Sequence, residues 1–291
     1  MTKRNPDYDF KWCPGCGDFG VVRAVELALA DRVTRLGEPI ENTVVVAGIG
    51  CSGNLVHLQE GPQPFGIHGI HGRTLPIAYG VKAARPELNV LVAAGDGDFL
   101  SIGAEHIGPA AKRNMDVTCV VMDNGIYGLT KGQASPTSAF EAVTPTTPLG
   151  KLDDAMNPLE LFLALGVNYI ASMLSTRPRD LAATIGEAME YPGFAIVHVQ
   201  SPCTTYNDTY AALKGNPKQG IEPAAYPLPE DHDPTNREQA MAHATSGRIP
   251  VGLLFRAPES IPMYQRLTGA RERAGQREAP DVEALLSTLE I

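Results

Sequence analysis

The sequence predicts a doubly wound α/β fold with a mostly parallel sheet. Four short runs are largely apolar rather than alternating, which suits strands covered on both faces: residues 43–49, 89–94, 116–122 and 193–199. Helix-length stretches separate these runs, and alternating strands and helices are typical of this class. With 291 residues, 43% of them hydrophobic, the chain can bury a sizeable core.

The expected helices follow in chain order. In residues 18–35 the apolar side chains Val21, Val25, Leu29 and Val33 lie on one helical face, and Asp18 is a plausible N-cap. Further helices are expected at residues 75–84, 101–112, 158–165, 178–190 and 235–244.

The composition changes after the last of the four strands, where the chain becomes rich in Pro, Gly, Asn and charge. We therefore expect one main domain over residues 1–203, which includes an N-terminal CxxC arm. Residues 204–291 are expected to form a C-terminal extension that packs on the same domain or on a partner.

Charge and hydropathy exclude two classes of protein. The formal net charge is −9 and no run of Lys and Arg appears, which argues against binding to a nucleic-acid backbone. No apolar run is long enough for a signal peptide or a transmembrane helix, so we expect a cytoplasmic protein.

The ends of the predicted strands carry polar residues and cysteines. In open α/β sheets the ligand crevice lies outside the carboxyl ends of the strands. The four strands lead into Gly50-Cys51, Gly95-Asp96, Asp123-Asn124 and Ser201-Pro202-Cys203. We therefore expect two oxygen ligands and two cysteines to face one crevice.

Two polar residues at strand ends resemble the thiamine diphosphate signature: Asp96 in a GDGD run, and Asn124, 28 positions later, in MDNGIYG. The pair predicts that the α/β fold is of the thiamine-diphosphate-binding type. A diphosphate with few basic residues nearby is usually held through a hard divalent cation that takes oxygen ligands from Asp, Asn and backbone carbonyls. The glycines allow close backbone approach, and a helix starting near Ser101 can face the anion with its N-terminus.

The cysteines indicate a metal or redox role. The Cys13-x-x-Cys16 spacing occurs in zinc ribbons, iron-sulfur clusters and thioredoxin-like sites, and alone does not choose among them. The motif precedes the first strand, unlike thioredoxin, and a second CxxC or a His pair for zinc is missing. Together with Cys51 and Cys203 the pair favours one 4Fe-4S cluster, with zinc or unligated thiols as alternatives. Cys119 is expected in the core.

Several longer motifs resemble the β subunit of 2-oxoacid:ferredoxin oxidoreductases, most of all the two-subunit 2-oxoglutarate type. The resemblance covers roughly residues 10–265 and rests on WCPGCG, GIGCSGN, HGIHGRTLPIAYGVKAA, GDGDFLSIG, NGIYGLTKGQASPT, SPCTTYN and HDPTNREQAM.

The resemblance implies an activity and partners. It implies thiamine diphosphate, Mg²⁺ and one 4Fe-4S cluster in this subunit, and a larger α subunit in an α2β2 assembly. The implied reaction is oxidative decarboxylation of 2-oxoglutarate with coenzyme A to succinyl-CoA and CO2, with electrons passed to ferredoxin, or the reverse carboxylation. Pyruvate or a broader 2-oxoacid range remains open, and a zinc-ribbon interaction module is the alternative of another class.

Site residues also carry over by position. The resemblance implies cluster ligation by Cys13, Cys16, Cys51 and Cys203, and Mg²⁺ ligation by Asp96, Asn124 and the Ile126 carbonyl. Asp123 stands where the thiamine signature more often has Asn. The expected cofactor contacts come from the loops at the strand ends: Gly50, Cys51, Ser52, His68, His71, Gly95, Asp96, Gly97, Asp98, Asn124, Ile126, Gly128, Leu129 and Thr130.

Three further residues are candidates for catalysis. His71 and Arg73, like His68, lie in a glycine-rich loop from which they could touch the diphosphate or a substrate carboxylate, with a purely structural role as the alternative. Asn54 could bind a substrate carboxylate or cap the following helix. Thiamine enzymes also need an activating glutamate, which in this family is placed in a separate domain, so we expect the chain to be inactive without its partner.

Overall fold

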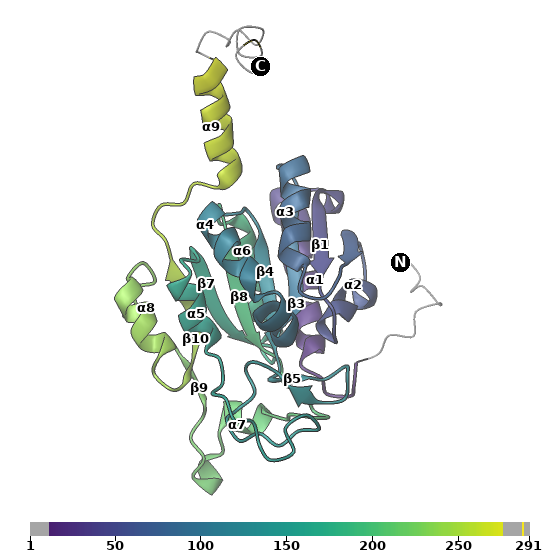
Figure 1. Cartoon of the computed structure of the whole chain (residues 1–291), viewed down its shortest axis with the longest axis vertical. Helices are drawn as coiled ribbons and strands as arrows, with labels where there is room; N and C mark the ends of the chain where they lie inside the picture. Colours follow the sequence, from purple (N-terminus) through teal and green to yellow (C-terminus); the bar gives the residue numbers. More distant parts are fainter. Residues whose placement is uncertain (1–11, 276–286, 288–291) are drawn as a thin grey trace.

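The computed structural model describes residues 12–275 and Ser287. Its main sheet has eight strands in the order β2-β1-β3-β4-β8-β7-β10-β9, and β5 and β6 form a separate two-stranded ribbon. All neighbours in the main sheet are parallel except β7 and β10. Helices cover both faces (Figure 1), which confirms the predicted fold class.

The strands are β1 Thr43–Ala47, β2 Phe65–His68, β3 Asn89–Gly95, β4 Thr118–Asp123, β5 Ile126–Tyr127, β6 Gln133–Ala134, β7 Tyr169–Leu174, β8 Ala195–Gln200, β9 Ala225–Pro227 and β10 Ile249–Arg256. The α-helices of the described part of the chain are α1 Asp18–Leu36, α2 Leu55–Leu58, α3 Thr74–Ala84, α4 Ile107–Arg113, α5 Pro158–Ala164, α6 Pro178–Glu190, α7 Tyr210–Lys214, α8 Arg237–Ala244 and α9 Met263–Gly275.

The central strands are buried on both sides, which explains their continuous apolar sequence. In β1, Val45 belongs to the core under α1 and α6, whereas its neighbours Val44 and Val46 belong to the core under α3, α4 and α5. Successive side chains of a strand point to opposite faces, so one apolar run supplies both cores.

Two local predictions were wrong. The residue at the N-cap of α1 is Gly17, not Asp18, whose buried carboxylate accepts a hydrogen bond from Ser201 Oγ at 2.6 Å. The helix expected over residues 101–112 is three pieces: a π-helical turn Asp98–Ile102, a 3-10 turn Ala104–His106, and α4. The helical segment therefore starts directly after Gly97, closer to the GDGD run than expected.

The C-terminal part adds strands that the sequence pattern did not reveal. β10 pairs with β7 and β9 pairs with β10, so both extend the main sheet. Pro250 and Gly252 interrupt the strand pattern of β10, and its position near the edge of the sheet tolerates them. Helix α9 projects beyond the sheet (Figure 1), and its first turn contacts α3, where Tyr79 lies next to Met263 and Lys82 over the ring of Tyr264. No helix within residues 12–275 combines the length and apolar character that a membrane span requires.

Candidate cofactor and cysteine site

A cavity of about 80 Å³ opens at the carboxyl ends of β1, β3 and β4. Its walls come from loops that follow these strands, as the parallel topology requires. The lining residues are Asp18, Ile49, Gly50, Cys51, Ser52, His71, Gly95, Asp96, Gly97, Asp98, Met122, Asn124, Ile126, Tyr127, Gly128, Leu129 and Thr130.

Two buried carboxylates, Asp96 and Asp123, lie side by side at the ends of β3 and β4. The Thr137 hydroxyl lies 2.8 Å from an oxygen of each. Burial, followed by the negative charge of Asp123, raises the pKa of Asp96 well above its ordinary value. A carboxylate in this position is stabilised by a cation.

The loop after β4 brings further oxygen atoms to the cavity. Gly125 has a φ of 66°, which allows the tight turn in which Asn124 Oδ1 accepts a hydrogen bond from the Ile126 backbone N–H at 2.9 Å. An amide oxygen has two lone pairs, so one remains for a metal ion. The Asn124 carbonyl is held by Asn207 Nδ2 at 2.8 Å, which fixes the loop. Asp96, Asn124 and Ile126 thus line one cavity.

The cysteines gather on the other side of Gly128. A β carbon at Gly128 would lie 3.5 Å from Cys51 Sγ and 3.6 Å from Cys203 Sγ. Cys16 interacts electrostatically with both, and Cys51 also with Cys13. All are free thiols. Burial, and then the charges of Asp18 and the neighbouring cysteines, raise the pKa of Cys51 to about 12.

The N-terminal arm reaches this place through contacts with residues far along the chain. Gly17 N–H donates to the Pro202 carbonyl at 3.0 Å. Thr204 Oγ1 donates to the Pro14 carbonyl at 2.9 Å, and Tyr210 donates to the Gly15 carbonyl at the same distance. The arm that carries Cys13 and Cys16 is therefore tied to the loop that carries Cys203.

His71 is held by Asp98. Its Nδ1 lies 2.6 Å from Oδ1 of the buried Asp98 carboxylate, and the same oxygen accepts hydrogen bonds from the backbone N–H groups of Ile49 and Gly72. The His71 ring lines the cavity next to Tyr127, which donates to the Gly97 carbonyl at 3.0 Å. Asp98 thereby joins three of the loops that form the cavity.

The structure brings together all the predicted cofactor contacts except His68, which lies outside the cavity wall with Nδ1 2.9 Å from His57 Nε2. Arg73 points away, towards the Ile102 carbonyl at 2.9 Å and Glu105 at 3.1 Å. Asn54 is buried just before α2 but makes no capping hydrogen bond, so its capping alternative was wrong.

Sequence reasoning missed four lining residues: Asp18, Ile49, Met122 and Tyr127. Three of them stand within or next to motifs and could have been found by extending each motif by one or two positions. Asp18 had been interpreted as a helix cap. Its carboxylate is held by the long-range contact with Ser201 and interacts electrostatically with Cys16 and Cys51, and burial raises its pKa to about 6.

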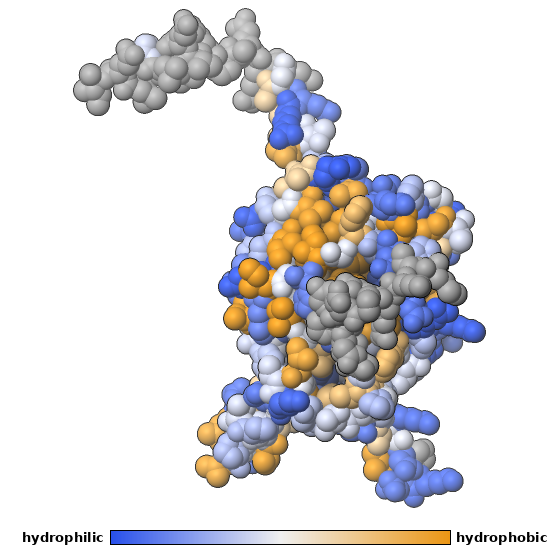
Figure 2. All heavy atoms as spheres, turned by 90° about the vertical axis from the view of Figure 1, so that its right-hand side faces the viewer, coloured by the Kyte–Doolittle hydropathy of each residue, from blue (hydrophilic) through white to orange (hydrophobic). Residues whose placement is uncertain are grey.

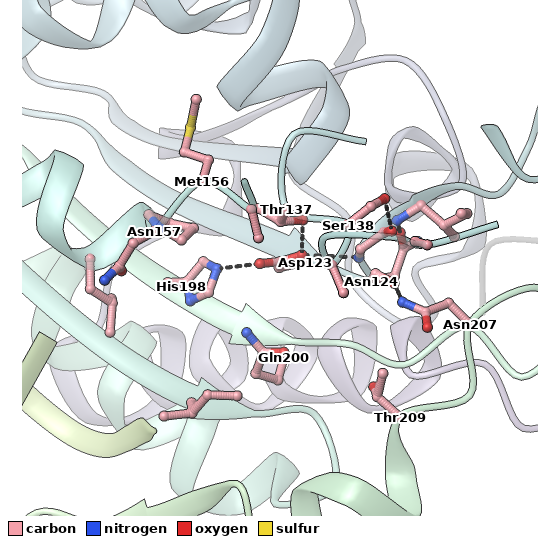
Figure 3. Close-up of a pocket in the computed structure, with 18 of the residues that line it drawn as sticks. Asp123, Asn124, Thr137, Ser138, Met156, Asn157, His198, Gln200, Asn207 and Thr209 are labelled. Carbon is pink, nitrogen blue, oxygen red and sulfur yellow. Dashed lines mark hydrogen bonds and ion pairs between the residues drawn. The ribbon is translucent and has the colours of Figure 1, made fainter. Parts of the chain in front are cut away.

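A second cavity, of about 700 Å³ (Figure 3), shares Asn124 and Ile126 with the first. Asp123, Thr137, His198 and Asn207 are among the residues that line it. His198 Nε2 lies 2.9 Å from Asp123 Oδ2, and both side chains are buried.

Two family models and several known proteins match this chain. Residues 48–199 match the thiamine pyrophosphate enzyme C-terminal TPP binding domain, and residues 203–272 match the family described as the C terminus of the pyruvate ferredoxin oxidoreductase beta chain. A 2-oxoacid:ferredoxin oxidoreductase subunit beta from Sulfolobus sp. is 36% identical, over 90% of this chain and 87% of its own. The 2-oxoglutarate oxidoreductase subunit KorB of Mycobacterium tuberculosis is 40% identical, over 74% of this chain and 56% of its own.

A solved structure is similar along almost the whole chain. It is 2-oxoglutarate:ferredoxin oxidoreductase from Magnetococcus marinus, with 2-oxoglutarate, coenzyme A and succinyl-CoA bound. The TM-score is 0.82 at 37% sequence identity, and the match covers 99% of this chain and 95% of that one.

Proposed function

Because the chain belongs to the family of 2-oxoacid:ferredoxin oxidoreductase β subunits, we propose that it is the β subunit of a 2-oxoglutarate:ferredoxin oxidoreductase. As a member of this family it is part of an oxidoreductase that acts with partner subunits. One observation carries the proposal: Cys51 lines the same cavity as Asp96 and Asn124, and Gly128 in its wall lies against both Cys51 and Cys203.

Asp96, the Asn124 amide oxygen and the Ile126 carbonyl would hold Mg²⁺. The buried pair of carboxylates supports this assignment, because no cationic side chain of the described residues pairs with Asp96 and hard oxygen donors are what Mg²⁺ prefers. The helical turn that begins at Asp98 would face the diphosphate with its backbone N–H groups. When bound, thiamine diphosphate provides the electron sink for the loss of CO2 from a 2-oxoacid.

Cys13, Cys16, Cys51 and Cys203 would hold one 4Fe-4S cluster. The described residues contain no group of three or more His, Cys, Asp or Glu side chains close enough for a single metal ion. The proposal is supported by the contacts among the cysteines: Gly128 lies against Cys51 and Cys203, and Cys51 also interacts with Cys13, as Cys16 does with Cys51 and Cys203. When bound, the cluster carries electrons towards ferredoxin.

His71 is the side chain best placed to act on a bound substrate. Asp98 occupies its Nδ1 side, so the rest of the ring faces the cavity and can hold a carboxylate or exchange a proton at Nε2. Arg73 would first have to leave Glu105, and Asn54 lies outside the cavity wall, so we assign both a secondary role.

The cavity is too small for the whole cofactor. Ligand pockets usually measure about 300–1,000 Å³, against about 80 Å³ here. A partner subunit therefore has to close the site and bring the activating glutamate. Large apolar side chains stand exposed on the surrounding elements: Phe65 at 64%, Ile70 at 73%, Ile102 at 47% and Leu129 at 51%. Apolar side chains also gather on the side that carries α3 (Figure 2), as expected of an interface.

Ile70→Asp should weaken assembly with the partner subunit, because it would bury a carboxylate in an apolar contact. We expect binding to weaken roughly 30-fold or more, measured by size-exclusion chromatography and by titration of the partner. Leu36→Asp is the matched control, since Leu36 is 40% exposed at the far end of α1. Equal assembly of both variants with the partner would place the interface elsewhere.

The substrate is tested by anaerobic co-purification with the partner subunit. We expect about four irons and one thiamine per chain, with viologen reduction that depends on coenzyme A and prefers 2-oxoglutarate to pyruvate. The relatives named for 2-oxoglutarate support this preference. A preference for pyruvate would change the substrate and leave the redox role intact. Zinc in place of iron would exclude the electron-transfer role.

A further inference from the structure

A chain of buried polar side chains runs from Asp96 across three neighbouring strands. Thr137 Oγ1 lies 2.8 Å from Asp96 Oδ2 and 2.8 Å from Asp123 Oδ1, and Asp123 Oδ2 lies 2.9 Å from His198 Nε2. Asp96, Asp123 and His198 are 2%, 6% and 2% exposed. Figure 3 shows Thr137 and His198 on two sides of Asp123. Thr137 is half-buried and links the two buried carboxylates, and these hydrogen bonds restrict the orientations of all four side chains.

The hydrogen-bond donors around Asp96 and Asp123 differ, and this difference distinguishes the two carboxylates. The Thr137 hydroxyl carries one proton for two acceptors. Asp123 has donors of its own, because Gly125 N–H reaches Oδ1 at 3.0 Å and His198 reaches Oδ2. Asp123 thus faces an imidazole as well as hydroxyl and backbone N–H donors. Among the described residues, Asp96 is contacted by the hydroxyls of Ser135 and Thr137 and by the backbone N–H of Gly97, and by no cationic or imidazole side chain, so Asp96 is the carboxylate left for a cation.

The turn at Ser135–Ser138 also holds the loop after β4, which carries Asn124. Ser138 Oγ donates to the Gly125 carbonyl at 2.6 Å, and Ser135 N–H donates to Ser138 Oγ at 2.8 Å. Thr137 thus contacts Asp96, and Ser138, the next residue of the same turn, contacts the Asn124 loop. Figure 3 shows Thr137 and Ser138 beside Asp123 and Asn124. The turn therefore links the loop after β3 to the loop after β4.

We propose that Thr137 is a positioning residue for Mg²⁺: its hydroxyl, braced by Asp123 and His198, orients the Asp96 carboxylate towards the metal. The inference rests on the magnesium assignment proposed above. Groups that hydrogen-bond to metal ligands typically change metal affinity 10–100-fold when they are removed. Thr137 does not line the cofactor cavity, so its effect should appear in metal binding rather than in recognition of the 2-oxoacid.

The test compares Thr137→Val, which keeps the shape but lacks the hydroxyl, with Thr137→Ser, which restores it. Thr245→Val is the matched control, because Thr245 lines the same second cavity and its hydroxyl donates to the Met241 carbonyl. Each complex with the partner subunit is stripped with EDTA and desalted. Calorimetry then gives the Mg²⁺ concentration for half-maximal thiamine diphosphate binding, and melting of the stripped complex reports the fold.

We expect Thr137→Val to raise that Mg²⁺ midpoint roughly 10–100-fold, while Thr137→Ser and Thr245→Val stay near wild type. At saturating Mg²⁺ the kcat should recover, and the KM for the 2-oxoacid should stay unchanged. An unchanged midpoint in Thr137→Val would overturn the positioning role and leave the magnesium assignment intact. Wild type that binds thiamine diphosphate independently of Mg²⁺ would overturn both. If the valine variant does not assemble, Thr137→Ala is read by the same criteria.

Discussion

Cys51→Ala should abolish electron transfer while leaving thiamine diphosphate binding in place. Loss of one thiolate from a four-cysteine group removes a ligand directly. Since removing a mere hydrogen-bond partner of a ligand costs up to about 100-fold, we expect viologen reduction to fall by at least roughly that factor. Iron and sulfide content should fall towards zero. The thiamine content of the complex should stay near one per chain, because the oxygen ligands of the cavity are untouched.

The control for this variant is Cys119→Ala. Cys119 is fully buried inside β4, where it behaves as a small core residue, and its removal leaves only a small void. Iron content and reduction rate should match wild type. Full iron content in Cys51→Ala, or loss of iron in Cys119→Ala, would contradict the assignment of the cluster ligands. Iron analysis and the visible absorption spectrum decide between these outcomes.

Asp96→Asn should weaken thiamine diphosphate binding and leave the iron content unchanged, the reverse of what we expect for Cys51→Ala. The amide keeps the size of the side chain and one oxygen but removes the charge that a cation needs, so thiamine diphosphate binding should weaken at least roughly 100-fold. Iron content should remain at the wild-type value. Calorimetric titration with thiamine diphosphate at fixed Mg²⁺ measures the loss, and exposed Asp154→Asn is the matched control. Wild-type affinity in Asp96→Asn would exclude Asp96 as a metal ligand.

The same variant should be more stable than wild type when cofactor is absent. Burial raises the pKa of Asp96 from 3.8 to about 7 in the folded chain. The stability that this group contributes is present below its unfolded pKa and is lost as pH rises through the folded pKa. Asp96→Asn should therefore melt at a higher temperature than wild type above pH 7, with a difference that narrows as pH falls towards 4. A constant difference across this range would contradict the shift.

How far the sequence could predict this site depends on the range of the interactions. The ends of β1, β3 and β4 were predictable, because strands buried on both faces are uniformly apolar and parallel strands end at one edge. Asp96 and Asn124 follow from that rule and line one cavity. Their roles as ligands, like those of the cysteines, remain predictions for the experiments above.

Contacts between segments that are distant in the sequence could not be predicted from the sequence. Asp18 resembles an ordinary helix cap until Ser201, 183 positions away, is seen to hold its carboxylate inside the protein. Thr137 ends the NGIYGLTKGQASPT motif, but the sequence does not show that its hydroxyl reaches Asp96 and Asp123. His198 lies between two valines of β8 and likewise shows no local pattern that points to Asp123. The segment after Gly97 was expected as one later helix because the π-helical turn Asp98–Ile102 has no periodicity of its own.

The hydrogen bonds between the N-terminal arm and residues 201–210 mean that the arm can take its place only late in synthesis of the chain. A growing chain exposes Cys13, Cys16 and Cys51 early, but Cys203 and the anchoring side chains of Thr204 and Tyr210 follow some 150 residues later. Until the ribosome has passed that point, the first three thiols have no finished site to occupy. In the cluster assignment proposed above, iron and sulfide would therefore enter only after residue 210 has been translated, so the cellular machinery that delivers them would act after Cys203 has emerged.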